Sequence, residues 1–156
     1  MTDTHRQKLI ELIESAIKSR PDREGILKTA VELIDDYSAD FNWTGIYMLD
    51  GDVLRVGPYV GPPTEHTVIP LDRGICGAAA SQKKTVVVDD VRSDPRFLAC
   101  SIYTRSEIVV PLMDGDVCLG EIDIDSNRPS NFSVKDRAML EQIAALLVAR
   151  LKQVPK

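Results

Sequence analysis

The stretch EIVVPLMDGDVCLGEIDID, residues 107–125, decides the fold. Its two apolar runs flank the pair Asp114-Gly115, and Asp-Gly between β-forming runs is a strong local signal for a hairpin with a primed turn. The sequence therefore predicts two antiparallel strands, Glu107–Met113 and Val117–Asp125. Because successive side chains of a strand point to opposite faces, the pattern also predicts which residues share a face.

Strand alternation separates acidic from apolar side chains in the second strand. It places Asp123 and Asp125 on one face, where Glu107 approaches them across the hairpin, and Cys118 with Ile122 on the other, core-facing side. Aspartate is a poor strand former, so the acidic face favours a function. Three converging carboxylates could bind a substrate ammonium, or share a proton and donate it as an acid. The alternative is an ordinary solvated face.

The segments around this hairpin predict an α+β domain. Apolar residues at helical spacing indicate helices over Thr4–Ser19 and from Ile26 to Tyr37, and Ser133 with Asp136 resembles a capping box that begins a C-terminal helix. Further short elements are expected between them: strands over 44–49, 53–59, 67–71 and 85–89, a helix over 74–82, and a proline-containing loop over 57–63.

We therefore expect one domain over residues 1–156, with N-terminal helices in 1–38 and the sheet, pocket segments and C-terminal helix in 40–156. The central antiparallel sheet would carry the N- and C-terminal helices on one face and a ligand pocket on the other.

Composition excludes several function classes. The chain has 156 residues, of which 44% are hydrophobic and 28% charged, as in ordinary globular proteins. A net charge of -5 and a single tryptophan argue against nucleic acid as a partner. With no apolar run near the roughly 18 residues of a membrane span and no signal core, we expect a cytoplasmic protein. Three cysteines without a Cys-x-x-Cys pair argue against a secreted disulfide framework and a structural zinc site. We expect no metal and no bound cofactor.

The three cysteines are candidate thiols, each with a structural alternative. Cys76 opens the expected short helix, whose dipole would stabilise a thiolate, although it could simply pack among neighbouring alanines. Cys100 lies in the irregular segment 90–105, where it would be accessible unless it is tucked under that loop. Cys118 is expected in the core, with a redox role only if that face is uncovered.

Two aromatic residues are candidate pocket walls. Trp43 and Tyr47 share one face of the first expected strand, where they could enclose an apolar ligand or serve as core packing. His5 and His66 show no metal-ligand spacing, so surface positions are expected for both.

Five motifs together resemble one known family. They are NWTGIY at 42–47, RGICG at 73–77, LAC at 98–100, SEIVVPL at 106–112 and GEIDIDS at 120–126. In this order they resemble the GAF-domain free methionine-R-sulfoxide reductases, over about residues 40 to 150.

The resemblance implies a GAF-like fold and a thiol-dependent reduction of free L-methionine-R-sulfoxide. Cys100 would attack the sulfur, release methionine and become a sulfenic acid. Cys76 would then form an intramolecular disulfide with it, because His66 stands where the family usually has a further cysteine. Thioredoxin would be the external reductant.

The family's acidic substrate-binding positions match Glu107, Asp123 and Asp125, which would hold the ammonium or hydrogen-bond the sulfoxide oxygen. Trp43 and Tyr47 would enclose the thioether end of the substrate.

Two other functions compete with the reductase. A noncatalytic GAF sensor would bind a small molecule in the same pocket and act on a partner, since one fold serves many functions. A structural or interaction protein would use its terminal helices as the seam of a homodimer and leave its thiols inert.

Overall fold

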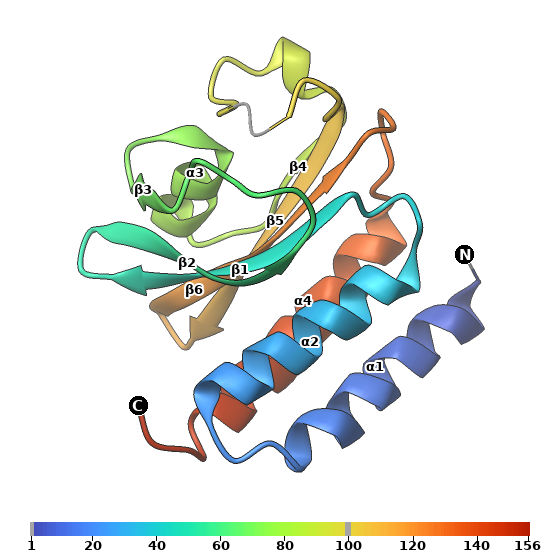
Figure 1. The fold of residues 1–156 in the computed structure, drawn as a ribbon, viewed down its shortest axis with the longest axis vertical. Helices are drawn as coiled ribbons and strands as arrows, with labels where there is room; N and C mark the ends of the chain where they lie inside the picture. The colour runs from blue at the N-terminus through green and yellow to red at the C-terminus, as the bar shows by residue number, and fades with distance from the viewer. Residues whose placement is uncertain (1, 99–100) are drawn as a thin grey trace.

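One antiparallel sheet runs through the middle of the molecule (Figure 1). The computed structural model describes residues 2–98 and 101–156. In sheet order the strands are β3 (Val68–Pro70), β2 (Val53–Val60), β1 (Trp43–Asp50), β6 (Val117–Ser126), β5 (Ser106–Asp114) and β4 (Val86–Val88).

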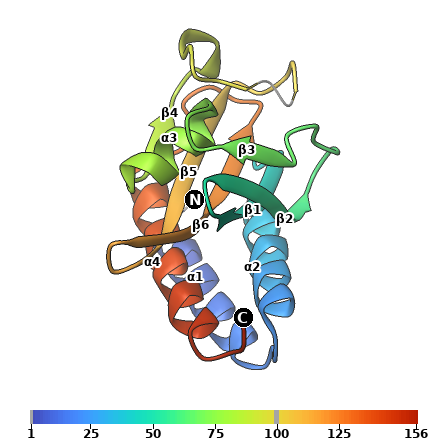
Figure 2. The ribbon, with the colours of Figure 1, turned by 90° about the vertical axis from the view of Figure 1, so that its left-hand side faces the viewer.

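Three long helices lie on one side of this sheet. They are α1 (Asp3–Lys18), α2 (Arg23–Tyr37) and α4 (Val134–Leu151). The helices α2 and α4 pack on the sheet, and α1 packs on both of them from outside (Figure 2). Their apolar faces and the sheet form the larger core, which includes Ile13, Ile26 and Leu140. None of the helices in the described ranges is both long and apolar enough to cross a membrane.

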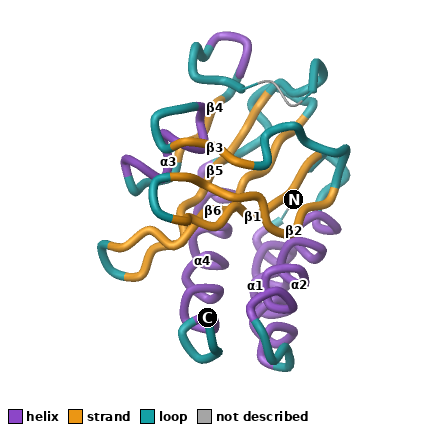
Figure 3. Tube along the Cα trace, turned by 60° about the vertical axis from the view of Figure 1, so that its left-hand side comes forward, coloured by secondary structure: helices purple, strands orange, loops and turns teal. Residues whose placement is uncertain are grey.

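The opposite face of the sheet carries α3 (Gly74–Gln82) and the short 3-10 helix η1 (Val91–Ser93), together with the loops around them (Figure 3). A second, smaller core lies between α3 and the sheet and includes Tyr47, Cys76 and Val109. The expected α+β arrangement, a central antiparallel sheet with the N- and C-terminal helices on one face, is confirmed.

Local signals placed the elements well. The helix expected over 74–82 has those bounds, and Ser133 and Asp136 form the reciprocal capping box that begins α4. Both hairpins turn at a glycine with positive φ, at Gly51 and Gly115, where a residue with a Cβ would be strained.

The strand expected over 53–59 is confirmed and continues to Val60, so the overlapping loop predicted over 57–63 is wrong for residues 57–60. The pairing of β3 with β2 ends at Arg55. Pro58 therefore lies beyond the part of β2 that pairs with β3, so its missing N–H costs no hydrogen bond to β3. A register shift against β1 between Gly45 and Tyr47 takes up an extra residue of β2 at the same place.

The predicted face of Cys118 is also wrong. Leu112 pairs with Gly120 but Met113 pairs with Cys118, so Leu119 is an extra residue that forms a β-bulge in β6. The bulge reverses the alternation, and Cys118 joins the smaller core beneath α3, whereas Ile122 joins the helix-side core. Cys118 is buried as expected, but on the face that carries the acidic residues.

Candidate active site

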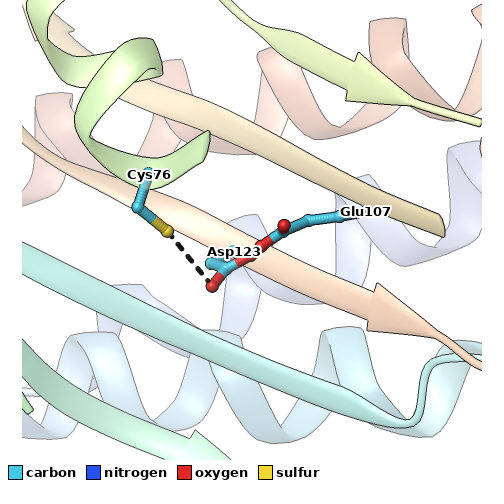
Figure 4. Close-up of side chains that lie close together, drawn as sticks. All are labelled: Cys76, Glu107 and Asp123. Carbon is cyan, nitrogen blue, oxygen red and sulfur yellow. Dashed lines mark hydrogen bonds between the residues drawn. The ribbon is translucent and has the colours of Figure 1, made fainter. Parts of the chain in front are cut away.

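A thiol and two carboxyl groups meet between α3 and the sheet (Figure 4). Cys76, in the first turn of α3, donates its Sγ–H to Oδ2 of Asp123 on β6 at 3.3 Å. Glu107 reaches the same point from β5. The Cys76 sulfur and one carboxylate oxygen from each of the two acids lie within 4.8 Å of one another. All three side chains are buried. The packing of α3 on the β5–β6 hairpin thus brings together Cys76 and Asp123, which are 47 positions apart in sequence.

Asp125 completes the acidic face. It lies directly opposite Glu107 in the β5–β6 ladder, while Asp123 lies opposite Val109. Only 3% of Asp125 and 5% of Glu107 is exposed, so the predicted convergence of three carboxylates occurs inside the protein rather than on a solvated face. The solvated-face alternative is therefore wrong.

Burial and mutual repulsion favour the protonated forms of the carboxyl groups in this cluster. Burial raises the pKa of Glu107 well above its ordinary value, and the charges of Asp123 and Asp125 raise it further. Burial likewise raises the pKa of Asp125 well above its ordinary value, with the charge of Asp123 as the next cause. The pKa of Asp123 is raised by burial against the lowering effect of hydrogen bonds with Glu107 and Cys76.

Two cavities adjoin the cluster. One of ≈ 20 Å³ is lined by Tyr47, His66, Ile69, Gly74, Ile75, Cys76, Leu98, Glu107 and Asp123. The other, of ≈ 180 Å³, is lined by Asn42, Trp43, Pro62, Ser101, Tyr103, Thr104, Asp125 and Asn127. The first has room for about one water molecule. A larger hollow of ≈ 610 Å³ lies between α2 and β2, on the helix side, and Cys76 is not among the residues that line it.

Trp43 and Tyr47 stand on one face, as predicted, with ring centroids 6.2 Å apart. Trp43 also stacks on Tyr59 at 5.2 Å. Its Nε1 donates to the carbonyl of Pro62, and the Tyr47 hydroxyl donates to the carbonyl of His66. The two aromatic residues therefore hold the segment between β2 and β3 over the site, in addition to lining its cavities.

The GAF domain family model matches residues 22–151. The chain belongs to the GAF domain family. The free methionine-R-sulfoxide reductase of Escherichia coli K12 is 35% identical over 115 residues, which cover 74% of this chain and 69% of that protein. The solved free methionine-R-sulfoxide reductase from Neisseria meningitidis, in complex with its substrate, has a TM-score of 0.91 at 34% identity and covers 97% of this chain and 92% of its own.

A more distant likeness shows the fold alone. The GAF domain of an Acinetobacter phosphoenolpyruvate-protein phosphotransferase has a TM-score of 0.85 at 20% identity, with 98% of this chain and 96% of that chain covered. Together these comparisons confirm the fold and the family resemblance predicted from the motifs.

In this GAF domain the environment of Cys76 opposes the thiolate predicted from its helix position. Burial raises the pKa of the Cys76 thiol well above its ordinary value, and the charges of Asp123, Glu121 and Glu107 raise it further. These effects outweigh the dipole of a helix of nine residues. This environment therefore favours the protonated thiol of Cys76 over the thiolate.

The GAF domain holds one further buried acid that our sequence analysis did not single out. Glu121 is 0% exposed, and burial raises its pKa well above the ordinary value, followed by the charge of Asp123. The signal was available, because Glu121, Asp123 and Asp125 occupy alternate positions of one strand and therefore share a face.

The predicted nucleophile, Cys100, lies outside the described residues. The nearest described residues on either side of it along the chain reach the site: Leu98 lines the smaller cavity and Ser101 lines the larger one. His66, expected at the surface, lines the smaller cavity together with Cys76.

Proposed function

We propose that this GAF domain reduces free L-methionine-R-sulfoxide to methionine through its thiols. The observation that carries the proposal is the Cys76 thiol, hydrogen-bonded to Asp123 inside a buried acidic cluster. Relatives from Escherichia coli and Neisseria meningitidis that bear the name free methionine-R-sulfoxide reductase support the same reaction.

The cluster offers the carboxyl groups that could bind the ammonium of a free amino acid. No described lysine or arginine contributes to the raised pKa values of Glu107, Asp123 and Asp125. The ammonium group of the substrate would supply the missing positive charge and hydrogen-bond donors. A protonated Glu107 would donate to the sulfoxide oxygen as the S–O bond breaks. Trp43 and Tyr47 would contact the thioether end.

The reaction proceeds in two thiol steps. In the first, the Cys100 sulfur attacks the sulfoxide sulfur, methionine leaves, and the oxygen remains on Cys100 as a sulfenic acid. In the second, the Cys76 sulfur attacks Cys100, a disulfide forms and the oxygen leaves as water. The two thiols together supply the two electrons that reduce the sulfoxide. Thioredoxin would restore both thiols by exchange.

Cys76 takes the resolving role in this scheme because His66 occupies the position of the family's additional cysteine. Cys118, although buried on the same face of the sheet, is not required by either step. This division of roles gives each cysteine a distinct expected phenotype.

The decisive experiment supplies the reduced protein with free methionine-R-sulfoxide, thioredoxin, thioredoxin reductase and NADPH. We expect NADPH consumption with the R epimer and none with the S epimer. Cys100→Ser abolishes turnover, Cys76→Ser releases about one equivalent of methionine and then stops, and Cys118→Ser, the matched thiol control, turns over normally.

A folded protein that binds methionine or another small molecule without turnover would contradict the reductase and establish the sensor function. Turnover in Cys100→Ser would contradict the assignment of the nucleophile.

A further inference from the structure

The thiol and the two carboxyl groups beneath α3 form a set of metal ligands, which the proposed reaction does not use as such. The Cys76 sulfur and one carboxylate oxygen each of Glu107 and Asp123 lie within 4.8 Å of one another. In a tetrahedral zinc site, bonds of about 2.0 to 2.3 Å separate the ligand atoms by about 3.6 Å. Small side-chain rotations therefore suffice to bring the three atoms onto one ion.

The hydrogen bonds of the cluster leave one carboxylate oxygen free for a ligand. Oδ2 of Asp123 accepts the Cys76 thiol at 3.3 Å, whereas its Oδ1 is buried and has no hydrogen-bond partner among the described residues. Only 4% of Asp123 is exposed, so water does not replace the missing partner from the surface. An unpaired polar atom at this depth is costly, and a bound cation removes the cost.

The smaller cavity adjoins all three ligands. It has a volume of ≈ 20 Å³, and Cys76, Glu107 and Asp123 all line it. That volume holds about one water molecule. Zinc sites with three protein ligands commonly complete their tetrahedron with a water, so the cavity has the size of the fourth ligand.

Charge and chemistry together select the ion. No described lysine or arginine forms a salt bridge with Glu107 or Asp123, so a cation would meet no competing positive charge among the described salt bridges. Oxygen ligands alone would suit Mg²⁺ or Ca²⁺, but the sulfur of Cys76 does not. Zn²⁺ accepts thiolate and carboxylate ligands together.

The sequence analysis expected no metal, because the ligands show no metal-ligand spacing along the chain. They come from α3, β5 and β6, and they meet only where α3 packs on the hairpin. The site is therefore a product of the tertiary fold.

We propose that Cys76, Glu107 and Asp123 bind one Zn²⁺ ion from solution, and that the bound ion reversibly inhibits the protein. Cys76 binds as the thiolate, its proton passes to solvent, and no electron is transferred. The ion occupies the proposed resolving thiol and two of the carboxyl groups proposed to bind the substrate. The inhibition, but not the binding, thus rests on the proposed function.

Direct binding to the reduced protein tests the site without any sulfoxide. Competition with a chromophoric chelator measures the affinity for Zn²⁺, and Cd²⁺ is the spectroscopic probe, because cadmium–thiolate bonds absorb in the ultraviolet. The double variant Cys100→Ser/Cys118→Ser keeps Cys76 as its single thiol. We expect this variant to bind one equivalent of either ion and to show the cadmium–thiolate absorption.

Substitution of each ligand identifies the site. In the wild-type background, Asp123→Asn and Glu107→Gln, which keep the side-chain shape, should weaken Zn²⁺ binding by at least about tenfold. Cys118→Ser, the matched thiol control, should bind as the wild type does. Zn²⁺ should also raise the urea concentration at the unfolding midpoint of the wild type and of Cys118→Ser, but not of Cys76→Ser. Midpoints measured without metal show that each variant is folded.

Three results would overturn the site. They are the absence of cadmium–thiolate absorption when Cys76 is the single thiol, an unchanged Zn²⁺ affinity in both Asp123→Asn and Glu107→Gln, and displacement of Zn²⁺ by an equal concentration of Mg²⁺.

Binding and turnover can fail separately. Zn²⁺ bound by the cluster of a protein that does not act on methionine-R-sulfoxide would refute the reductase and leave the metal site standing. In an active protein, Zn²⁺ should stop methionine release in a single turnover, and a chelator should restore it. Thioredoxin is omitted from this assay, since its own thiols bind the metal. Methionine release at the full rate with the site filled would overturn the inhibition.

Discussion

Glu107 and Asp125 lie directly opposite each other in the β5–β6 ladder, with 5% and 3% of their surfaces exposed. Two like charges in this position destabilise a sheet, and burial adds a desolvation cost to each. Both effects favour a protonated form of the pair, so the stability of the fold is expected to depend on pH.

The protein should become less stable as the pH rises. Burial raises the pKa of Glu107 and of Asp125 well above their unfolded values, so the folded state binds more protons than the unfolded state between the two values. The resulting stabilisation is complete below the unfolded pKa and is lost as the pH rises through the folded pKa. The urea concentration at the unfolding midpoint should therefore decrease as the pH rises above the unfolded pKa values of these two carboxyl groups.

Asp125→Asn is the matched control for this dependence, since it removes one titrating group and keeps the shape. The unfolding midpoint of this variant should decrease less steeply with rising pH than that of the wild type. A midpoint that increases with pH over this range in the wild-type protein would contradict the proton-sharing interpretation.

Replacing Glu121 by leucine should stabilise the fold by about 1 to 3 kcal/mol, because an unpaired buried carboxyl group is exchanged for an apolar side chain of similar size. Chemical unfolding at neutral pH measures the difference, with Glu121→Gln as a control that keeps a polar group and gains less. A loss of stability in Glu121→Leu would mean that the carboxyl group has a structural partner.

Gly74→Ala should weaken the junction between α3 and the segment that follows η1. Gly74 has a φ of +70°, and a Cβ there would lie 2.9 Å from Cδ1 of Leu98. The backbone strain alone costs about 1 to 2 kcal/mol. Because both residues line the smaller cavity, turnover should fall together with stability. Gly115→Ala at the hairpin tip is the control, because Gly115 also has a positive φ but a Cβ there would meet nothing within 4 Å. This variant therefore shows the effect of backbone strain without that of steric crowding.

The single tryptophan should report ligand binding directly. Trp43 lines the larger cavity together with Asp125 and stacks on Tyr59. Addition of free methionine should change its fluorescence, and Asp125→Asn should weaken the apparent affinity by about tenfold, the effect of losing one hydrogen bond to a charged group. Asp116→Asn, exposed at the hairpin tip, should bind as the wild type does. An unchanged affinity in Asp125→Asn would mean that the Asp125 carboxylate does not contact the ligand.

Sequence reasoning located most elements and the acidic face, because periodicity and turn chemistry are local. The Asp114-Gly115 turn, the Ser133 capping box and the convergence of Glu107 with Asp123 and Asp125 all follow from patterns a few residues long.

The errors arose where a distant contact or an irregularity decides the outcome. The extra residue at Leu119 leaves no local signal in its own strand, so Cys118 was assigned to the wrong face. The state of Cys76 was misjudged because its dominant neighbours, Asp123 and Glu107, come from strands far along the chain. The continuation of β2 past Pro58 depends on where β3 ends.

The β-bulge at Leu119 has a consequence for engineering. The stretch of β6 that carries Glu121, Asp123 and Asp125 is held by its pairing with β1, from Trp43 opposite Asp125 to Met48 opposite Gly120. The hairpin tip around Gly115 lies on the other side of the bulge, where neither strand is paired with β1. Peptides inserted at the tip should leave the acidic positions unmoved, so an epitope or fluorophore attached there can report on the domain without altering its chemistry.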